Sequence, residues 1–148
     1  MPDTIATETL IDAPIERVWD AVGDHRRFGS WFKVALDQPF VAGRQSTGHI
    51  THPGYEHVRW TADVVAVEPR TRLAFRWHPY AIDSDRDYSS EPTTLVEILL
   101  DRVGDATRLR VVESGFDALP TARRDEAFGM NSSGWDQQMA NVRAFVEG

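Results

Sequence analysis

The sequence predicts an α+β domain in which a curved antiparallel sheet of about six to seven strands packs against one long C-terminal helix. Three observations predict it. Apolar and polar residues alternate repeatedly through the middle of the chain, two short helical patterns follow the first strand, and one long amphipathic pattern ends the chain. A sheet with one apolar face needs a cover, and the C-terminal helix is the long element left to supply it. We therefore expect a single domain over residues 1–148, with a hollow between sheet and helix.

The first elements are a strand and two short helices. Residues 4–11 are rich in Thr and Ile and are typical of a strand. Pro14 then stands where a first helical turn tolerates a missing N–H group. The apolar positions of this helix recur every three or four residues: Ile15, Val18, Trp19 and Val22. Gly23 ends it, and Asp24 is a suitable N-cap for a second helix. That helix brings three aromatic residues to one side: Phe28, Trp31 and Phe32.

The middle of the chain predicts strands. The segment 57–67 is long enough for one strand, and its inward positions alternate: Val58, Trp60, Ala62, Val64 and Ala66. Residues 68–71 contain Pro at the second position of a turn. The next strand also alternates, with three inward residues: Leu73, Phe75 and Trp77. Residues 79–92 are rich in Asp and Ser and predict a polar loop.

A hairpin and the final helix complete the chain. Gly104 and Asp105 supply the turn chemistry of the hairpin. Its inward positions are Val96, Ile98 and Leu100 on one strand, and Leu109, Val111 and Glu113 on the other. Pro120 opens the helix, whose predicted apolar stripe is Trp135, Met139, Val142 and Phe145. The preceding residues 131–134 are small or polar, so we expect them to border a cavity mouth or to let the sheet approach. Gly134→Leu would then overpack the site.

Composition excludes several classes of protein. The chain has 16 basic and 23 acidic residues, and its net charge of −7 disfavours binding to nucleic acid or to anionic membranes. No cysteine is present, which excludes disulfides and thiol chemistry. No apolar run is long enough for membrane insertion. The N-terminus has neither a basic start nor an apolar stretch, so we expect no signal peptide and a cytoplasmic location.

Motifs for covalent or metal chemistry are weak. Ser132 and Ser133 lie in the predicted helix rather than in a strand-to-helix nucleophile elbow. Lys33 is the only lysine, and a surface position is its simplest interpretation. His52 and His57 could meet in one loop, but nothing fixes a third ligand. We therefore expect neither a metal nor a cofactor.

Aromatic residues give a stronger signal, since the chain has five Trp, seven Phe and three Tyr. Each alone fits an ordinary core, because aromatic side chains dominate cores by area. Large rings around a partly filled hollow, with a few polar groups among them, are typical of a small-molecule site. The predicted ligand-binding residues are Trp31, Phe32, Trp60, Phe75, Trp77, Val111, Glu113, Gly134, Trp135 and Met139.

Glu113 interrupts an otherwise apolar face, because it continues the alternation of Leu109 and Val111. A buried carboxylate must be paired, hydrogen-bonded or neutral. Two interpretations stay open. Glu113 reaches solvent or pairs with an arginine such as Arg76, or it points inward and serves as a ligand contact or a general acid/base. Without a basic partner, burial disfavours its charge, and Glu113→Gln would then stabilise the protein. With an arginine partner the sign reverses, and the same substitution would destabilise it.

The order of these elements and several local motifs resemble the START-like, helix-grip proteins of the SRPBCC superfamily, and within it the AHSA-type subfamily, named after a homologue of a heat-shock-chaperone ATPase activator. The motifs that carry the resemblance are residues 11–19, Trp31-Phe32, Val67-Glu68-Pro69, residues 73–77, 107–109 and 113–116, and Gly134-Trp135. The resemblance implies a helix-grip fold with a deep cavity, open at one end, that holds an apolar small molecule. It covers nearly the whole chain.

Three functions are compatible with such a cavity. The first is a carrier or sensor of an apolar or aromatic ligand, lipid- or polyketide-like. The second is a cyclase or dehydratase that uses the same cavity, and the third is a chaperone ATPase co-factor. Binding without catalysis is preferred, because Glu113 is the one proton-transfer group that we can name. The expected partner is an apolar small molecule, and the chain is expected to be a monomer or a homodimer.

Overall fold

The structure is a computed structural model that describes residues 3–83 and 85–148, and in these residues it has seven strands and three α-helices. The elements are β1 (Thr4–Ile11), α1 (Ile15–Gly23), α2 (His25–Phe32), β2 (Val34–Leu36), β3 (Gln45–Ile50), β4 (Arg59–Glu68), β5 (Arg72–Trp77), β6 (Thr94–Val103), β7 (Ala106–Ser114), a 3₁₀ turn (Phe116–Ala118) and α3 (Thr121–Glu147). The predicted α+β fold, with two short helices after the first strand, is confirmed.

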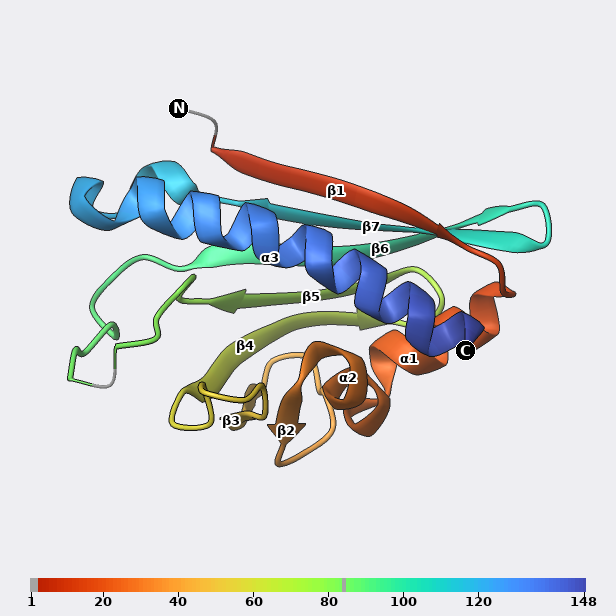
Figure 1. Ribbon diagram of the computed structural model, residues 1–148, viewed down its shortest axis with the longest axis horizontal. Coiled ribbons are helices and arrows are strands. Elements are labelled where there is room, and N and C mark those ends of the chain that lie inside the picture. The colour runs from red at the N-terminus through yellow and green to blue at the C-terminus, as the bar shows by residue number, and fades with distance from the viewer. Residues whose placement is uncertain (1–2, 84) are drawn as a thin grey trace.

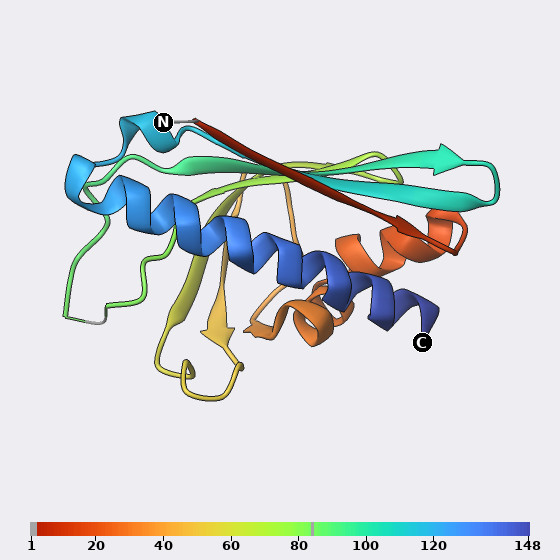
Figure 2. The same cartoon turned by 45° about the horizontal axis from the view of Figure 1, so that its top comes forward.

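The strands form one antiparallel sheet in the order β1-β7-β6-β5-β4-β3-β2. Figure 1 shows α3 running across this sheet, with α1 and α2 beside its C-terminal half. In Figure 2 the β2–β4 side of the sheet swings away from the β1–β7–β6 side, so the sheet is strongly curved. The long helix therefore lies on the concave face, as the helix-grip prediction requires.

The two short helices fold as their sequence predicts. Asp24 caps α2, and its carboxylate accepts hydrogen bonds from the N–H groups of Arg26 and Arg27 at 2.9 and 3.3 Å. The hydrogen bond from the Arg27 backbone is the main reason why the pKa of Asp24 is lowered. Gly29 allows α2 to approach β2, because a Cβ atom there would lie 2.2 Å from the carbonyl oxygen of Val34.

The apolar stripe of α3 differs from the prediction at its last position. The buried residues are Trp135, Met139, Val142 and Val146, whereas Phe145 is 40% exposed. From Val142 to Phe145 the helix turns about 300°, which places Phe145 beyond the edge of the stripe. Val146 returns to the stripe after a full turn. The prediction of Phe145 was therefore wrong, and the spacing is 4, 3 and 4.

Candidate ligand-binding pocket

Glu113 is fully buried on β7, under α3, so the inward prediction from its alternation with Val111 is confirmed. Its carboxylate accepts hydrogen bonds from two indole N–H groups, Trp77 Nε1 and Trp135 Nε1, each at 2.8 Å. Asn131 Nδ2 donates at 2.9 Å, and Thr94 Oγ1 donates at 2.5 Å. Three of these donors have no acceptor lone pair, so the surroundings suit a group that only accepts.

The alternative interpretation, in which Glu113 reaches solvent or pairs with an arginine such as Arg76, was wrong. Arg76 is exposed on the opposite face of β5, because its neighbours Phe75 and Trp77 take the inward positions. Among the described residues, the Glu113 carboxyl group meets four neutral donors and forms no ion pair with a cation. These donors come from β5, β6 and α3, so Glu113 ties the long helix to the centre of the sheet.

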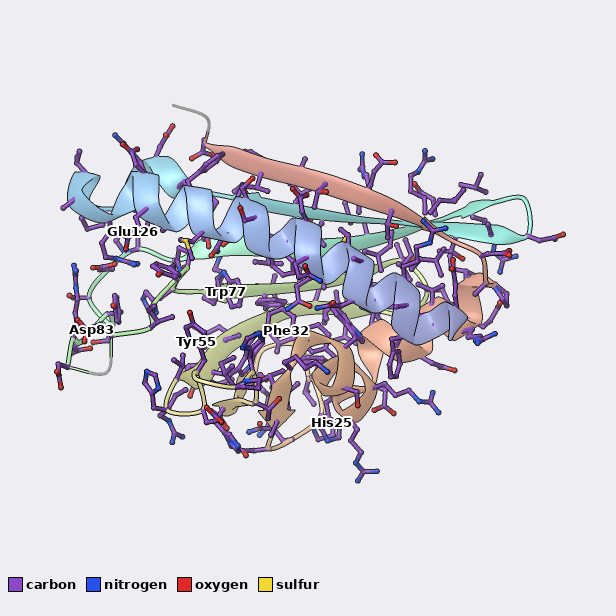
Figure 3. The ribbon with its side chains drawn as sticks, in the orientation of Figure 1. His25, Phe32, Tyr55, Trp77, Asp83 and Glu126 are labelled. Atoms are coloured by element: carbon purple, nitrogen blue, oxygen red, sulfur yellow. The ribbon has the colours of Figure 1, made fainter. Side chains whose placement is uncertain are left out.

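An aromatic cluster fills much of the space under α3. Phe32 lies between Trp60, Trp77 and Trp135, with ring centroids 5.3, 6.2 and 5.9 Å away. Trp77 also contacts Phe75 and Trp60 at 5.4 Å. Figure 3 shows Phe32 from α2 and Trp77 from the end of β5 close to each other in this region. The hollow expected between sheet and helix is therefore largely occupied by rings.

The sheet itself forks between β4 and β5. Pairing between these strands begins at Asp63 and Arg76 and continues to Glu68 and Arg72. The first four residues of β4, 59–62, pair with β3 alone. Beyond Arg76, β5 pairs with β6 up to Trp77 and Thr94, and the chain then turns away. The two strands therefore diverge and leave an opening in the sheet.

A pocket of about 520 Å³ occupies this fork, and we call it the fork pocket. Trp60, Trp77 and Phe32 supply its aromatic wall. The loop after β5 supplies Tyr80, Ala81, Ile82 and Tyr88, and α3 supplies Asn131. Polar side chains of the outer face, among them Arg59, Asp63 and Arg76, surround its other side. The fork pocket therefore joins an apolar interior to a charged mouth.

A second pocket, of about 150 Å³, lies on the α3 side of the same rings and is called the helix pocket here. It is lined by Phe32, Trp77, Asn131, Gly134, Trp135 and Gln138. Three of these residues also line the fork pocket: Phe32, Trp77 and Asn131. These three form the partition between the two pockets, and Glu113 binds two of them directly.

The structure brings together only part of the predicted site. Phe32, Trp60 and Trp77 line the fork pocket, and Gly134 and Trp135 line the helix pocket. The other predicted residues line neither: Trp31, Phe75 and Val111 are buried in the core, Glu113 lies behind the tryptophans, and Met139 is buried beside an outer groove between β1 and α3.

One interpretation expected that the small residues 131–134 let the sheet approach the helix. At Gly134 the sheet does not approach. Gly134 is exposed, and a Cβ atom there would meet nothing within 4 Å. The expected overpacking by Gly134→Leu is therefore not supported, because open space surrounds this position. The other interpretation, that residues 131–134 border a cavity mouth, agrees with the helix pocket.

The loop between β5 and β6 is fastened to α3 by Arg123. Arg123 Nε donates to Glu91 Oε1 at 2.9 Å, and its terminal nitrogens donate to the carbonyl oxygens of Tyr80 and Pro79 at 3.1 and 3.0 Å. Arg123 also lies over the Tyr88 ring at 4.7 Å. These contacts hold Tyr80 in the left-handed region, at φ 51°. Burial raises the pKa of the Tyr80 phenol, and Tyr80 lines the fork pocket.

Several lining residues were missed by sequence reasoning. Tyr80, Ile82 and Tyr88 belong to the segment predicted as a polar loop, yet they are the large apolar residues within it. That contrast with the surrounding Asp and Ser residues was the available signal. Arg59 and Arg76 were missed because they alternate outward, and only the fork brings an outward face into the pocket.

The described residues contain neither a metal-binding cluster nor a membrane-spanning helix. Among residues 3–83 and 85–148, no three His, Asp or Glu side chains come close enough to hold a metal ion. Within the same ranges, no helix is both long and apolar enough to span a bilayer.

Comparison with known proteins decides the family. Residues 12–147 match the sequence profile described as "Activator of Hsp90 ATPase homolog 1-like protein". The chain belongs to this family. The predicted AHSA-type membership of the SRPBCC superfamily is thereby confirmed. No curated protein matches this AHSA1-like chain.

Solved structures with the same fold cover almost the entire AHSA1-like chain. DynU16, a protein of the dynemicin biosynthetic locus, is 25% identical with a TM-score of 0.77, over 99% of this chain and 48% of DynU16. MLL2253 from Mesorhizobium loti is 22% identical with a TM-score of 0.75, over 97% and 96% of the two chains. CV1439 from Chromobacterium violaceum is 20% identical with a TM-score of 0.70, over 100% and 99%. This chain spans about half the length of DynU16.

Proposed function

We propose that this protein binds an apolar or aromatic small molecule, lipid- or polyketide-like, in the fork pocket. The observation that carries the proposal is the pocket itself, a space of about 520 Å³ against Trp60, Trp77 and Phe32. Small-molecule sites are concave and mostly apolar, with a few polar groups that fix the orientation of the ligand. Asn131 and Tyr80 supply such groups here.

The preorganisation of the wall supports the same function. Trp77 and Asn131 are fixed by Glu113, and Trp60 Nε1 donates to Ser46 Oγ at 2.9 Å. Rings whose polar atoms are already bonded offer their faces to a ligand with little loss of side-chain entropy. DynU16 shares this fold and belongs to the dynemicin biosynthetic locus, which is consistent with a small-molecule ligand for this fold.

Glu113 supports binding rather than catalysis. A general acid/base must reach the proton that it moves, within hydrogen-bond distance or through one water molecule. Glu113 lines neither pocket, and its two oxygens are occupied by four donors. Its role in the proposed function is to position Trp77 and Asn131. The cyclase-like alternative would need a different proton-transfer group.

The test is a calorimetric titration of a panel of flavonoids, fatty acids and small polyketides, with a variant that fills the pocket. Ala81→Phe places a ring in the fork pocket, whereas Ala122→Phe places the same ring on an exposed position of α3 that lines neither pocket. We expect saturable binding by at least one compound, loss of that binding in Ala81→Phe, and unchanged binding in Ala122→Phe. Absence of binding by every compound, or equal binding by both variants, would contradict the proposal.

A further inference from the structure

The mouth of the fork pocket carries two arginines without acidic partners. Arg59 on β4 and Arg76 on β5 both line the pocket. In the part of the chain that the structure describes, neither forms an ion pair or donates a side-chain hydrogen bond. Elsewhere on the described surface, six arginines form ion pairs, namely Arg27, Arg72, Arg86, Arg102, Arg108 and Arg143. What sets Arg59 and Arg76 apart from the remaining unpaired surface arginines is that both line the pocket.

Acidic residues are few among the side chains that line this mouth. The chain has a net charge of −7, yet Asp63 is the single Asp or Glu among the described lining residues. Asp63 lies opposite Arg76 in the sheet, but the two side chains are not within ion-pair distance. The Asp63 carboxylate is instead near Gln45 Nε2, at 3.5 Å. The side chains that line the mouth therefore include two guanidinium groups and one carboxylate.

The main chain of β4 adds hydrogen-bonding groups to the same opening. The N–H and carbonyl groups of Val64 point to the β3 side of β4. The N–H group donates to Arg44 O at 3.0 Å, and the carbonyl accepts from Gly43 N at 2.8 Å. Peptide groups alternate in direction along an antiparallel strand, so those of Arg59 and Thr61 face β5. The pairing with β5 begins only at Asp63, so these peptide groups open into the fork.

The opposite end of the pocket is aromatic and apolar. Trp60 and Trp77 are 5.4 Å apart between ring centroids, and Ile82 and Tyr80 close the wall from the loop. A ligand that satisfies both ends must be amphiphilic, with an apolar body and an anionic head. The planar guanidinium group of arginine binds carboxylates through two parallel hydrogen bonds.

We propose that the fork pocket takes an amphiphilic carboxylic acid, with its carboxylate between Arg59 and Arg76 and its apolar body against Trp60 and Trp77. This inference rests on the proposed function and names the class of ligand. Arg59 and Arg76 then determine specificity, since an uncharged analogue of the same shape keeps the apolar contacts and loses the charged ones.

The test compares naphthalene-2-carboxylate with naphthalene-2-carboxamide, which share shape but differ in charge. Both are titrated calorimetrically into the full chain and into Arg59→Gln and Arg76→Gln. Arg110→Gln is the matched control, because Arg110 is an exposed arginine on β7 that lines neither pocket. We expect the carboxylate to bind about 10-fold more tightly than the amide. Each pocket variant should bind the carboxylate about 3- to 10-fold more weakly and the amide with unchanged affinity. The effect of each arginine is moderate because exposure and salt weaken each contact.

The outcomes separate the two proposals. Equal affinity of acid and amide, with both pocket variants unchanged, would overturn the carboxylic-acid inference and leave the proposed function standing. If Arg110→Gln lost as much affinity for the carboxylate as the two pocket variants, the inference would also be overturned, because the effect would then come from the overall charge of the protein. Failure of both compounds to bind would overturn the inference and, together with a negative panel of other ligands, the proposed function as well.

Discussion

Glu113→Gln is the substitution for which the structure makes the sharpest prediction. The side chain keeps its shape, but one carboxylate oxygen becomes an NH₂ group that cannot accept a hydrogen bond. With the NH₂ group at the Oε2 position, the Thr94 hydroxyl can turn and accept, while the indole of Trp77 loses its acceptor. With the NH₂ group at the Oε1 position, Asn131 can flip its amide, while the indole of Trp135 loses its acceptor.

Either orientation therefore leaves one buried indole N–H group without an acceptor. An unsatisfied buried donor costs about 1–3 kcal/mol. We expect Glu113→Gln to lower the free energy of unfolding by about 2 kcal/mol. The sequence-based expectation for a Glu113 without a basic partner had the opposite sign, because it did not include the four neutral donors.

The assay is urea unfolding followed by far-UV circular dichroism, which does not depend on the tryptophan environment. Glu8→Gln, an exposed position on β1, is the matched control and should change stability by less than about 0.5 kcal/mol. Adding Trp77→Phe to Glu113→Gln removes the orphaned donor. The double variant should therefore be more stable than the sum of the single effects predicts, by about 1 kcal/mol. A stability of Glu113→Gln equal to wild type, with additive effects in the double variant, would refute the reasoning.

Three further predictions concern local structure and are checked by the same unfolding experiment. Gly134→Ala should stabilise the protein by about 0.5–1 kcal/mol, because α3 gains a better helix former in open space; destabilisation would contradict the exposed placement. Gly29→Ala should destabilise it by more than about 1 kcal/mol, because the new Cβ meets the Val34 carbonyl, and a neutral result would contradict that contact. Asp24→Ala should cost about 1 kcal/mol near pH 7. Because the pKa of Asp24 is lowered in the folded state, this difference is fully present above the unfolded value and should vanish as pH falls through the folded one; a pH-independent difference would contradict it.

The fold was predictable because its signals are local and periodic. The strand alternation around Trp60 and Phe75, the N-cap at Asp24 and the hairpin turn at Gly104 each predicted the element that the structure contains. The inward direction of Glu113 followed from the same two-residue period. One error arose at the end of α3. With 3.6 residues per turn, the buried stripe continues at Val146 and not at Phe145.

The site was only partly predictable because it depends on where two strands separate. No periodic signal indicates that β4 leaves β5 at Asp63, and this divergence brings Arg59 and Arg76 into the pocket wall. The partners of Glu113 come from three elements that are distant in sequence, namely Trp77, Thr94 and Asn131 with Trp135. A single sequence shows that the carboxylate points inward, but it does not show which donors meet it.

The most direct test of ligand binding in the fork pocket is the indole N–H region of a ¹H–¹⁵N correlation spectrum during titration with a compound that binds. The chain has five tryptophans, and each gives one indole signal that a Trp→Phe variant assigns. Trp60 and Trp77 line the fork pocket, whereas Trp31 donates to Ala21 O in the core and lines neither pocket. We predict saturable shifts of the Trp60 and Trp77 signals, with the Trp31 signal unchanged. A shift of the Trp31 signal with those of Trp60 and Trp77 unchanged would contradict the account.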